Sequence, residues 1–140
     1  MLLDTNVLSE LMRPRPDAAV LDWFAAPAAQ VAMSISAITK AEILLGIGLL
    51  PHGQKRAALA QAAQAMFEAD FKGRVLVFDS DTAELYARIV AERSALGRPI
   101  STEDAQIAAT ALQHRLPLVT RNTRNFEHIS ELQLINPWQG

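Results

Sequence analysis

The sequence predicts an α/β protein, specifically a three-layer α/β/α sandwich with a mainly parallel central sheet. Short apolar stretches alternate with longer amphipathic ones along the chain, which is typical of strands joined by helices. Strands in such an order pair in parallel through right-handed crossovers. The 140 residues include 50% hydrophobic residues and no repeat or obvious linker, so residues 1–140 are expected to form a single domain with a substantial core.

The first half of the chain is divided by clear start and stop residues. A short apolar strand over residues 1–3 is followed directly by Asp4. Pro14 and Pro16 cannot continue a helix, so they separate two helices. Ser36 is a favourable N-cap for the next helix. The elements predicted for this half are strands at 1–3 and 31–34 and helices at 5–12, 17–26, 36–50 and 54–72.

The second half repeats the alternation. Asp81 and Glu84 form an Asp-x-x-Glu variant of a capping box for one helix, and Gly97 ends it. Ser101 is the predicted N-cap of the next helix, which carries Asp104 in its first turn. The elements predicted for this half are strands at 74–78, 117–120 and 132–135 and helices at 79–96 and 101–111.

Composition limits the function classes. The net charge of −2 argues against a protein that coats nucleic acid through bulk electrostatics. There is no cysteine, and the three histidines are far apart in sequence, so any metal should be a hard cation on oxygen ligands. No basic leader opens the chain and no apolar run approaches the roughly 20 residues that span a bilayer, so the protein is expected to be cytoplasmic.

Asp104 is the first candidate functional residue. Ile100, Ile107 and Ala111 lie one or two turns away on the same helix face, so Asp104 heads an apolar stripe and is expected to point toward the core. Burial of an unpaired carboxylate costs several kcal/mol, so such a group is hydrogen-bonded, neutralised or bound to a cation. The alternative is an acid that only stabilises the first turn of its helix.

Asp4 and Glu42 repeat this pattern. Asp4 follows the first strand, where the alternative is an N-cap for the next helix. Glu42 lies in mid-helix with Ile38 and Leu45 on its side, and no Lys or Arg is placed three or four residues away to pair with it. The alternative for Glu42 is a surface acid. Gly46, one turn further on, indicates that something approaches the helix closely there.

Parallel topology predicts where these residues meet. Ligands bind beyond the carboxyl ends of parallel strands, so Asp4, Ser34 and residues 120–122 are expected at one edge of the sheet. Converging carboxylates without His or Cys suit Mg²⁺ or Mn²⁺. Without a Gly-rich phosphate loop, the favoured reaction is phosphodiester hydrolysis by a metal-activated water.

Four segments occur in an order and at spacings that match a known family. They are residues 2–10, 41–46, 104–111 and 118–122, and the chain ends with Asn136-Pro137-Trp138. These segments resemble the motifs of PIN-domain ribonucleases, and more closely those of the VapC-type toxins of type II toxin–antitoxin systems. The ending resembles the FitB-like branch of those toxins.

The resemblance implies a PIN-like fold and a Mg²⁺- or Mn²⁺-dependent endoribonuclease that cleaves cellular RNA such as tRNA or rRNA and inhibits translation. Asp4, Glu42 and Asp104 match the acids of the family. Asp4 and Asp104 would ligate the metal directly, and Glu42 would bind metal or orient the water. The family often has a further acid where this chain has Asn122 and Asn125, and Asn122 is retained as a further candidate ligand.

Polar and basic residues around these acids are the next candidates. Those expected to orient the carboxylates are Thr5, Asn6 and Thr120. Those expected to hold RNA phosphates are Arg121, Arg124 and Lys40. The alternatives are hydrogen bonding at turns and strand ends for the first group and solvated surface charge for the second.

Partners follow from apolar surplus and from the resemblance. The early helices and the long helix carry more large apolar residues than one inward face needs, which predicts an apolar groove; these residues are Met12, Trp23, Phe24, Met66 and Phe67. The resemblance implies a cognate VapB-like antitoxin, a homodimer within a larger toxin–antitoxin assembly, and DNA contact only through the antitoxin. No membrane partner is expected.

Two other functions stay open. One is a phosphatase with Asp4 as an aspartyl nucleophile, although Asn6 stands where a second Asp is expected. The other is a catalytically weak binding module of the same fold that acts as an antitoxin-controlled regulatory subunit, because the further acid of the family is absent.

Overall fold

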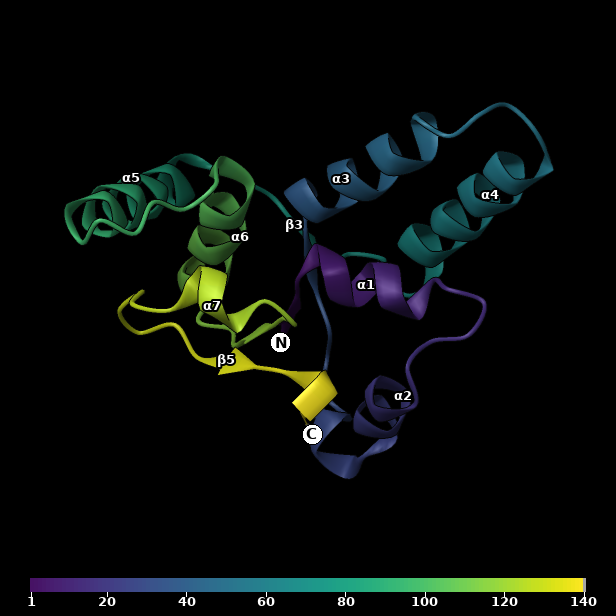
Figure 1. Ribbon diagram of the computed structural model, residues 1–140, viewed down its shortest axis with the longest axis horizontal. Coiled ribbons are helices and arrows are strands. Elements are labelled where there is room, and N and C mark those ends of the chain that lie inside the picture. The colour runs from purple at the N-terminus through teal and green to yellow at the C-terminus, as the bar shows by residue number, and fades with distance from the viewer. Residues whose placement is uncertain (140) are drawn as a thin grey trace.

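The computed structural model describes residues 1–139 of the chain. Five strands of two residues each are separated by one or two α-helices, seven α-helices in all, and two 3₁₀ helices complete this part of the chain (Figure 1). The strands are β1 (Leu2–Leu3), β2 (Ile35–Ser36), β3 (Val75–Leu76), β4 (Leu118–Val119) and β5 (Leu134–Ile135). The helices are α1 (Thr5–Leu11), α2 (Ala18–Ala25), η1 (Pro27–Ala29), α3 (Ala37–Gly48), α4 (Gln54–Ala69), α5 (Ser80–Ala95), α6 (Thr102–Gln113), α7 (Thr123–Phe126) and η2 (Pro137–Gln139).

The sheet is parallel throughout these residues. β1, β4 and β5 form one hydrogen-bonded group with β4 in the middle, and β2 pairs with β3. A parallel bridge between Leu2 and Ser34 joins the two groups, with the Leu3 N–H donating to the Ser34 carbonyl at 2.9 Å. The strands therefore run in the order β3-β2-β1-β4-β5, which places β1 at the centre and Asp4 at its carboxyl end.

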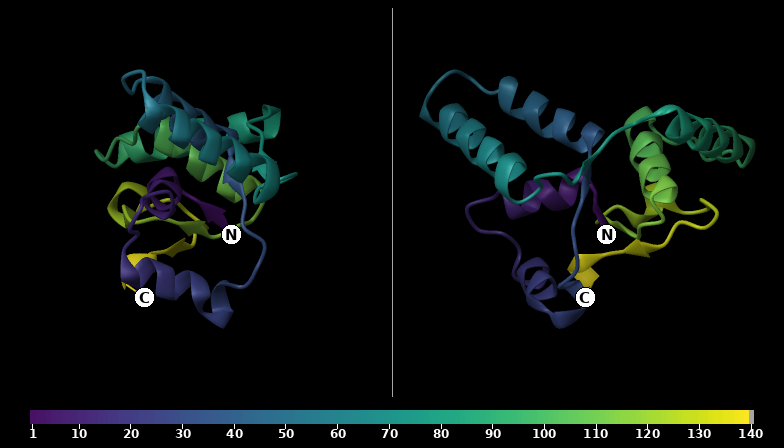
Figure 2. Two further views of the ribbon diagram at one scale, coloured as in Figure 1. Left: turned by 90° about the vertical axis from the view of Figure 1, so that its right-hand side faces the viewer. Right: turned by 180° about the vertical axis from the view of Figure 1, so that it is seen from behind.

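Successive strand residues face opposite helical layers. Leu2 belongs to a buried cluster with residues of α5 and α6, whereas Leu3 belongs to another with residues of α1, α3 and α4. This alternation is the two-residue period of a strand covered on both faces. The predicted α/β/α sandwich is confirmed. Figure 2 shows α2 on the side of the molecule away from α3 and α4, near the C-terminal residues.

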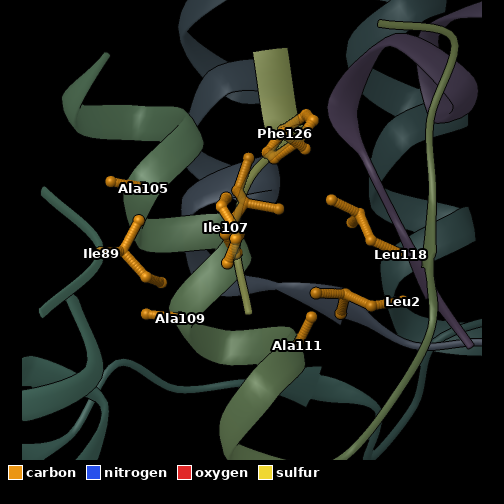
Figure 3. Packing of buried hydrophobic residues seen from close by; sticks show 10 residues of the cluster. Leu2, Ile89, Ala105, Ile107, Ala109, Ala111, Leu118 and Phe126 are labelled. Carbon is orange, nitrogen blue, oxygen red and sulfur yellow. The ribbon is translucent and has the colours of Figure 1, made fainter. Parts of the chain in front are cut away.

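The small residues of α6 allow it to lie close to the sheet. Five of its residues from Ala105 to Ala111 are apolar and fully buried. Figure 3 shows Ile107 projecting from α6 toward Leu2, Leu118 and Phe126. Complete burial of a side chain of this size stabilises the fold by about 1.5–3 kcal/mol. The first turn of α6, with Asp104, is fixed by this packing.

The predicted strand at 31–34 is wrong in position. The observed strand begins at Ile35, which is fully buried, whereas Val31 is 53% exposed in the segment that follows η1. A β-branched residue without a partner strand gains little from its propensity. Ser34 therefore forms only an isolated bridge to Leu2, and the strand ends at Ser36, which caps α3 as predicted.

Two further predictions need correction. The capping box of α5 uses Asp79 and Thr82 rather than Asp81 and Glu84, since the Asp79 carboxylate accepts from the Thr82 N–H at 3.1 Å. The four-residue helix α7 was not predicted because it is too short to show a period. Its Phe126 is 1% exposed and anchors it to the core. Within residues 1–139, no helix combines the length and apolarity needed to cross a membrane.

Candidate active site

Asp4 lies at the centre of the candidate site. Its side chain is 4% exposed and follows the central strand as the N-cap of α1. One carboxylate oxygen accepts from the Thr5 N–H at 2.8 Å, and the other accepts from the Thr120 hydroxyl, also at 2.8 Å. Asp4 does cap α1, as the alternative reading expected. Capping alone does not explain its burial, because a capping acid can lie on the helix surface. Asp4 is therefore both a cap and a buried carboxylate.

The protonation of Asp4 reports on its neighbours. Burial raises the pKa of Asp4 to about 6, against the hydrogen bonds from Thr120 and Thr5, which lower it. Repulsion from Asp104 and Glu42 raises this pKa further. Asp104 and Glu42 therefore lie within electrostatic range of Asp4.

Glu42 is connected to Asp4 through Thr5. The Thr5 hydroxyl donates to Oε1 of Glu42 at 2.7 Å and lies 3.0 Å from the Thr39 hydroxyl, while its N–H holds Asp4. Glu42 is half-buried. The predicted inward apolar face around it is wrong, since Leu45 is 62% exposed. Glu42 lies at the border between the core and an open surface of α3.

Asp104 occupies the first turn of α6, as predicted, and the Ser101 hydroxyl accepts from its N–H at 3.2 Å. Burial raises the pKa of its half-buried carboxyl, while the hydrogen bond from Ser101 lowers it. The Asn125 side-chain amide lies 3.5 Å from Oδ2 of Asp104. Asn125, one of the two asparagines at the position of the family's further acid, is therefore in contact with this carboxylate.

Thr120 links the remaining predicted residues. Besides donating to Asp4, its hydroxyl accepts from the Asn122 N–H at 3.0 Å, and the Asn6 amide approaches it at 3.5 Å. The Asn6 carbonyl oxygen in turn accepts from the Arg121 N–H at 3.3 Å. Thr5, Asn6 and Thr120 therefore all contact the acids or one another, and Asn122 is tied to them through its backbone.

None of the three acids is paired with a cation. Within residues 1–139 the ion pairs join Arg13 to Glu10 and Arg88 to Glu92. In the same residues, no three acidic or histidine side chains form a preformed metal cage. Mg²⁺ does not require one, since it binds through one or two carboxylates and keeps several waters. The donor set, three carboxylates with no sulfur or imidazole, fits Mg²⁺ or Mn²⁺.

The predicted phosphate-binding residues differ in their surroundings. Arg121 and Arg124 are exposed near the acids, and both line a polar cavity together with Asn122 and Asn125. The Lys40 ammonium instead lies 5.4 Å from the ring centre of Phe67. A cation–π contact of this kind accounts for the position of Lys40 without any substrate.

Arg93 is a buried residue near the site that the prediction missed. It is 5% exposed, and its guanidinium donates to the carbonyls of Arg98 and Asn125, both at 2.8 Å. The Arg98 carbonyl lies in the segment that leads into α6, the helix of Asp104. The Asn125 carbonyl lies in α7. The spacing of Thr82, Ile89 and Arg93 on one face of α5 was the available indication that Arg93 points inward.

We expect Arg93→Met to lower the free energy of unfolding by about 2–4 kcal/mol, because a buried guanidinium and its charged hydrogen bonds to two carbonyls are lost. Denaturant unfolding in EDTA measures this change. Arg88→Met is the matched control on the same helix, since Arg88 makes only an exposed pair with Glu92 at 3.9 Å. Equal stability of the two variants would show that Arg93 does not hold these segments.

An apolar groove opens beside Glu42. It has a volume of about 560 Å³ and lies between α1, α3 and α4. Its apolar lining includes Met12, Ile43, Ile47, Leu50 and Leu59. The predicted groove is therefore present, but only Met12 of the residues proposed for it lines it; the other four pack against the core.

Gly46 lies on the wall of this groove. A Cβ atom added there would meet nothing within 4 Å. Within residues 1–139, nothing approaches Gly46 closely, so the expectation of a close approach is not met inside the chain itself.

The fold and site together define an α/β protein with buried and half-buried acids at the carboxyl edge of a parallel sheet. The PIN domain family matches residues 1–132, and this chain belongs to that family. It is 39% identical over 99% of its length to VapC ribonuclease Y4jK of Sinorhizobium fredii, covering 98% of that protein. It is also 39% identical to Toxin FitB of Neisseria gonorrhoeae, again over 99% of this chain and 98% of that one.

A solved structure agrees with these relatives. The structure of FitAB bound to an IR36 DNA fragment superimposes with a TM-score of 0.88 at 38% identity, covering 98% of this chain and 94% of that one. The resemblance to PIN-domain toxins is therefore confirmed in both sequence and fold.

Proposed function

We propose that this protein is the toxin of a toxin–antitoxin pair and that it is a metal-dependent endoribonuclease. Its substrate is cellular RNA such as tRNA or rRNA, and its action inhibits translation. The observation that carries the proposal is a buried Asp4 at the carboxyl end of the central strand, held by Thr5 and Thr120, with the Thr5 hydroxyl also donating to Glu42. The names of the relatives, VapC ribonuclease and Toxin FitB, support the same class.

In this proposal Asp4 and Asp104 hold the cation, Mg²⁺ or Mn²⁺, and Glu42 binds it or orients the attacking water. When bound, the metal activates water and offsets charge on the departing oxygen. The chain supplies the orientation. Thr120 and the Thr5 N–H donate hydrogen bonds to the two carboxylate oxygens of Asp4. The Thr5 hydroxyl donates to Oε1 of Glu42, which leaves Oε2 for a water.

Asn122 is proposed as a weak further ligand through its side-chain carbonyl oxygen, and Asn125 as a residue that orients Asp104. Arg121 and Arg124 are proposed to hold RNA phosphates, with Lys40 a weaker candidate because Phe67 already engages it.

The partner in this proposal is a VapB-like antitoxin, bound in the groove between α1, α3 and α4, within an assembly of toxin homodimers. The antitoxin supplies the DNA contact. The solved structure of FitAB bound to an IR36 DNA fragment supports an antitoxin partner in a complex that binds DNA. An apolar groove of this volume suits the apolar face of a helical or extended peptide.

We expect Gly46→Leu to weaken antitoxin binding at least tenfold, because the new side chain enters the groove. Folding should be retained or improved, since glycine in mid-helix costs roughly 1 kcal/mol. Calorimetric titration of the two purified proteins measures the affinity. Gly48→Leu is the matched control, because Gly48 is on the same helix with open space around it but outside the groove. Equal affinities for both variants would exclude this groove as the docking site.

The second candidate, a catalytically weak binding module, is favoured by Asn122 and Asn125 at the position of the family's further acid. A phosphatase is disfavoured. Its second Asp would stand at the position of Asn6, whose side chain instead contacts Thr120 and the Arg121 N–H.

The deciding experiment incubates antitoxin-free protein with structured RNA and Mg²⁺ or Mn²⁺. Cleavage that EDTA stops supports the nuclease, and no cleavage with any metal supports the binding module.

A further inference from the structure

A polar cavity adjoins the acids on the side of β4. Its volume is about 540 Å³, and two arginines, three asparagines, a threonine and a glutamine line it. The lining has a formal charge of +2 beside a cluster of carboxylates. Asn125 belongs to this cavity and also contacts Asp104 at 3.5 Å. Asn122, another lining residue, donates through its N–H to the hydroxyl that holds Asp4. The cavity and the acid site therefore share a wall.

Arg121 is held in place although its side chain is exposed. Its N–H donates to Oδ1 of Asn6 at 3.3 Å, and its carbonyl accepts from the Asn136 amide, also at 3.3 Å. Its guanidinium lies 5.0 Å from the centre of the Trp138 ring. A solvated surface arginine loses much side-chain entropy on binding a ligand, whereas an arginine stacked on an indole has already lost part of it. Arg121 is thus preorganised for an anion.

The C-terminal Asn136-Pro137-Trp138 segment builds this support. Oδ1 of Asn136 accepts from the Trp138 N–H at 2.9 Å, while its amide holds the Arg121 carbonyl. Trp138 packs against the core cluster on the α1 side of the sheet. Asn136 thereby fixes both the indole of Trp138 and the loop that carries Arg121. The C-terminal segment thus holds the Arg121 side chain in place.

We propose that this cavity is a nucleotide-binding subsite that holds one nucleotide of the RNA next to the bond that is cut. Arg121 binds its phosphate, and the amides of Asn122 and Asn125 face its base. The inference rests on the proposed ribonuclease function and deepens it. A negatively charged peptide is the other occupant that the charge allows, but amide groups offer both donors and acceptors for a base edge, and the apolar groove for a peptide lies elsewhere.

The test measures RNA binding without cleavage. A fluorescein-labelled RNA hairpin with a seven-nucleotide loop is titrated with the full-length protein in EDTA, and anisotropy is followed at several NaCl concentrations. We expect Arg121→Gln to weaken binding about tenfold and to lower the salt slope by about one, as for a lost phosphate contact. Arg74→Gln is the charge-matched control, since Arg74 is exposed and precedes β3, at the opposite edge of the sheet. It should stay within about twofold of wild type.

Asn136→Ala separates positioning from contact. Asn136 acts through Arg121, so Arg121→Gln combined with Asn136→Ala should bind no more weakly than Arg121→Gln alone. A purely structural loss would add to the effect and would also lower the thermal midpoint, which circular dichroism measures for each variant.

The outcomes discriminate between this inference and the proposed function. Arg121→Gln binding like Arg74→Gln, while metal-dependent cleavage persists, overturns the subsite alone. Competition by poly-glutamate as effective as that by unlabelled RNA also overturns it, because the surface would then accept any acidic polymer. A wild-type protein that binds the hairpin through Arg121 but never cuts RNA refutes the nuclease and leaves only RNA binding at this cavity. No binding of the hairpin overturns the subsite, and the cleavage assay with metal then decides the nuclease separately.

Discussion

Asp4→Asn and Asp104→Asn should each reduce RNA cleavage roughly a thousandfold or more at saturating Mg²⁺. Each substitution removes a negative oxygen donor, and a bound divalent ion contributes several kcal/mol of charge stabilisation in the transition state. Asn keeps the size and shape of Asp, so the buried position beside Thr120 remains filled. The measurement is the single-turnover cleavage rate of a structured RNA, with the protein in excess.

The control for these variants is Asp22→Asn, which changes an exposed acid on α2. It changes the net charge equally and should cleave at the wild-type rate. Retention of hairpin binding by Asp104→Asn would place the defect in chemistry rather than in RNA affinity. Undiminished cleavage by either Asp4→Asn or Asp104→Asn would refute the assignment of the three acids.

In metal-free buffer, raising the pH from 4 to 7 should lower the contribution of Asp4 to stability by up to about 3 kcal/mol. The pKa of Asp4 is about 6 in the folded protein and 3.8 in the unfolded chain. Between these pH values the folded state therefore holds the proton more tightly than the unfolded state. Stability then falls as pH rises through this window and levels off above pH 6. A difference of about two pKa units corresponds to roughly 3 kcal/mol.

Urea unfolding in EDTA at several pH values tests this expectation. Asp4→Asn should abolish this part of the pH dependence and should be more stable than wild type above pH 6, because no buried charge remains. Mg²⁺ should stabilise the wild type at pH 7.5 and leave Asp4→Asn nearly unchanged. A variant that is less stable than wild type at pH 7.5 in EDTA would mean that helix capping by Asp4 outweighs its burial.

The sequence singles out the three acids because each departs from a simple local rule. Asp104 heads an apolar stripe, Asp4 ends a buried strand, and Glu42 has no helical partner of opposite charge. These patterns depend only on the period of helices and strands, so they survive errors in element boundaries. The misplaced strand at 31–34 did not affect them, because Ser34 contributes nothing to the acid network.

The supporting residues were harder to foresee. Arg93 reaches Asn125 across 32 positions of sequence, and the hydroxyl of Thr120 reaches Asp4 across 116. α7 is too short to have a period, yet it delivers Asn125 to Asp104. The exposed fraction of Leu45 likewise depends on how α3 packs against α4. The sequence of one helix does not determine how much of its apolar face a neighbouring helix covers.

By itself, therefore, the sequence determined the order of strands and helices and the parallel sandwich, and it singled out three candidate acids, since these follow from residue periodicity and from the short-range preferences of the chain. Only the tertiary structure decided the pKa of Asp4, the position of Arg121 on Trp138 and the shape of the two cavities. These depend on desolvation and on contacts between residues remote in sequence, whose free energies are set by distance in space and not by separation along the chain.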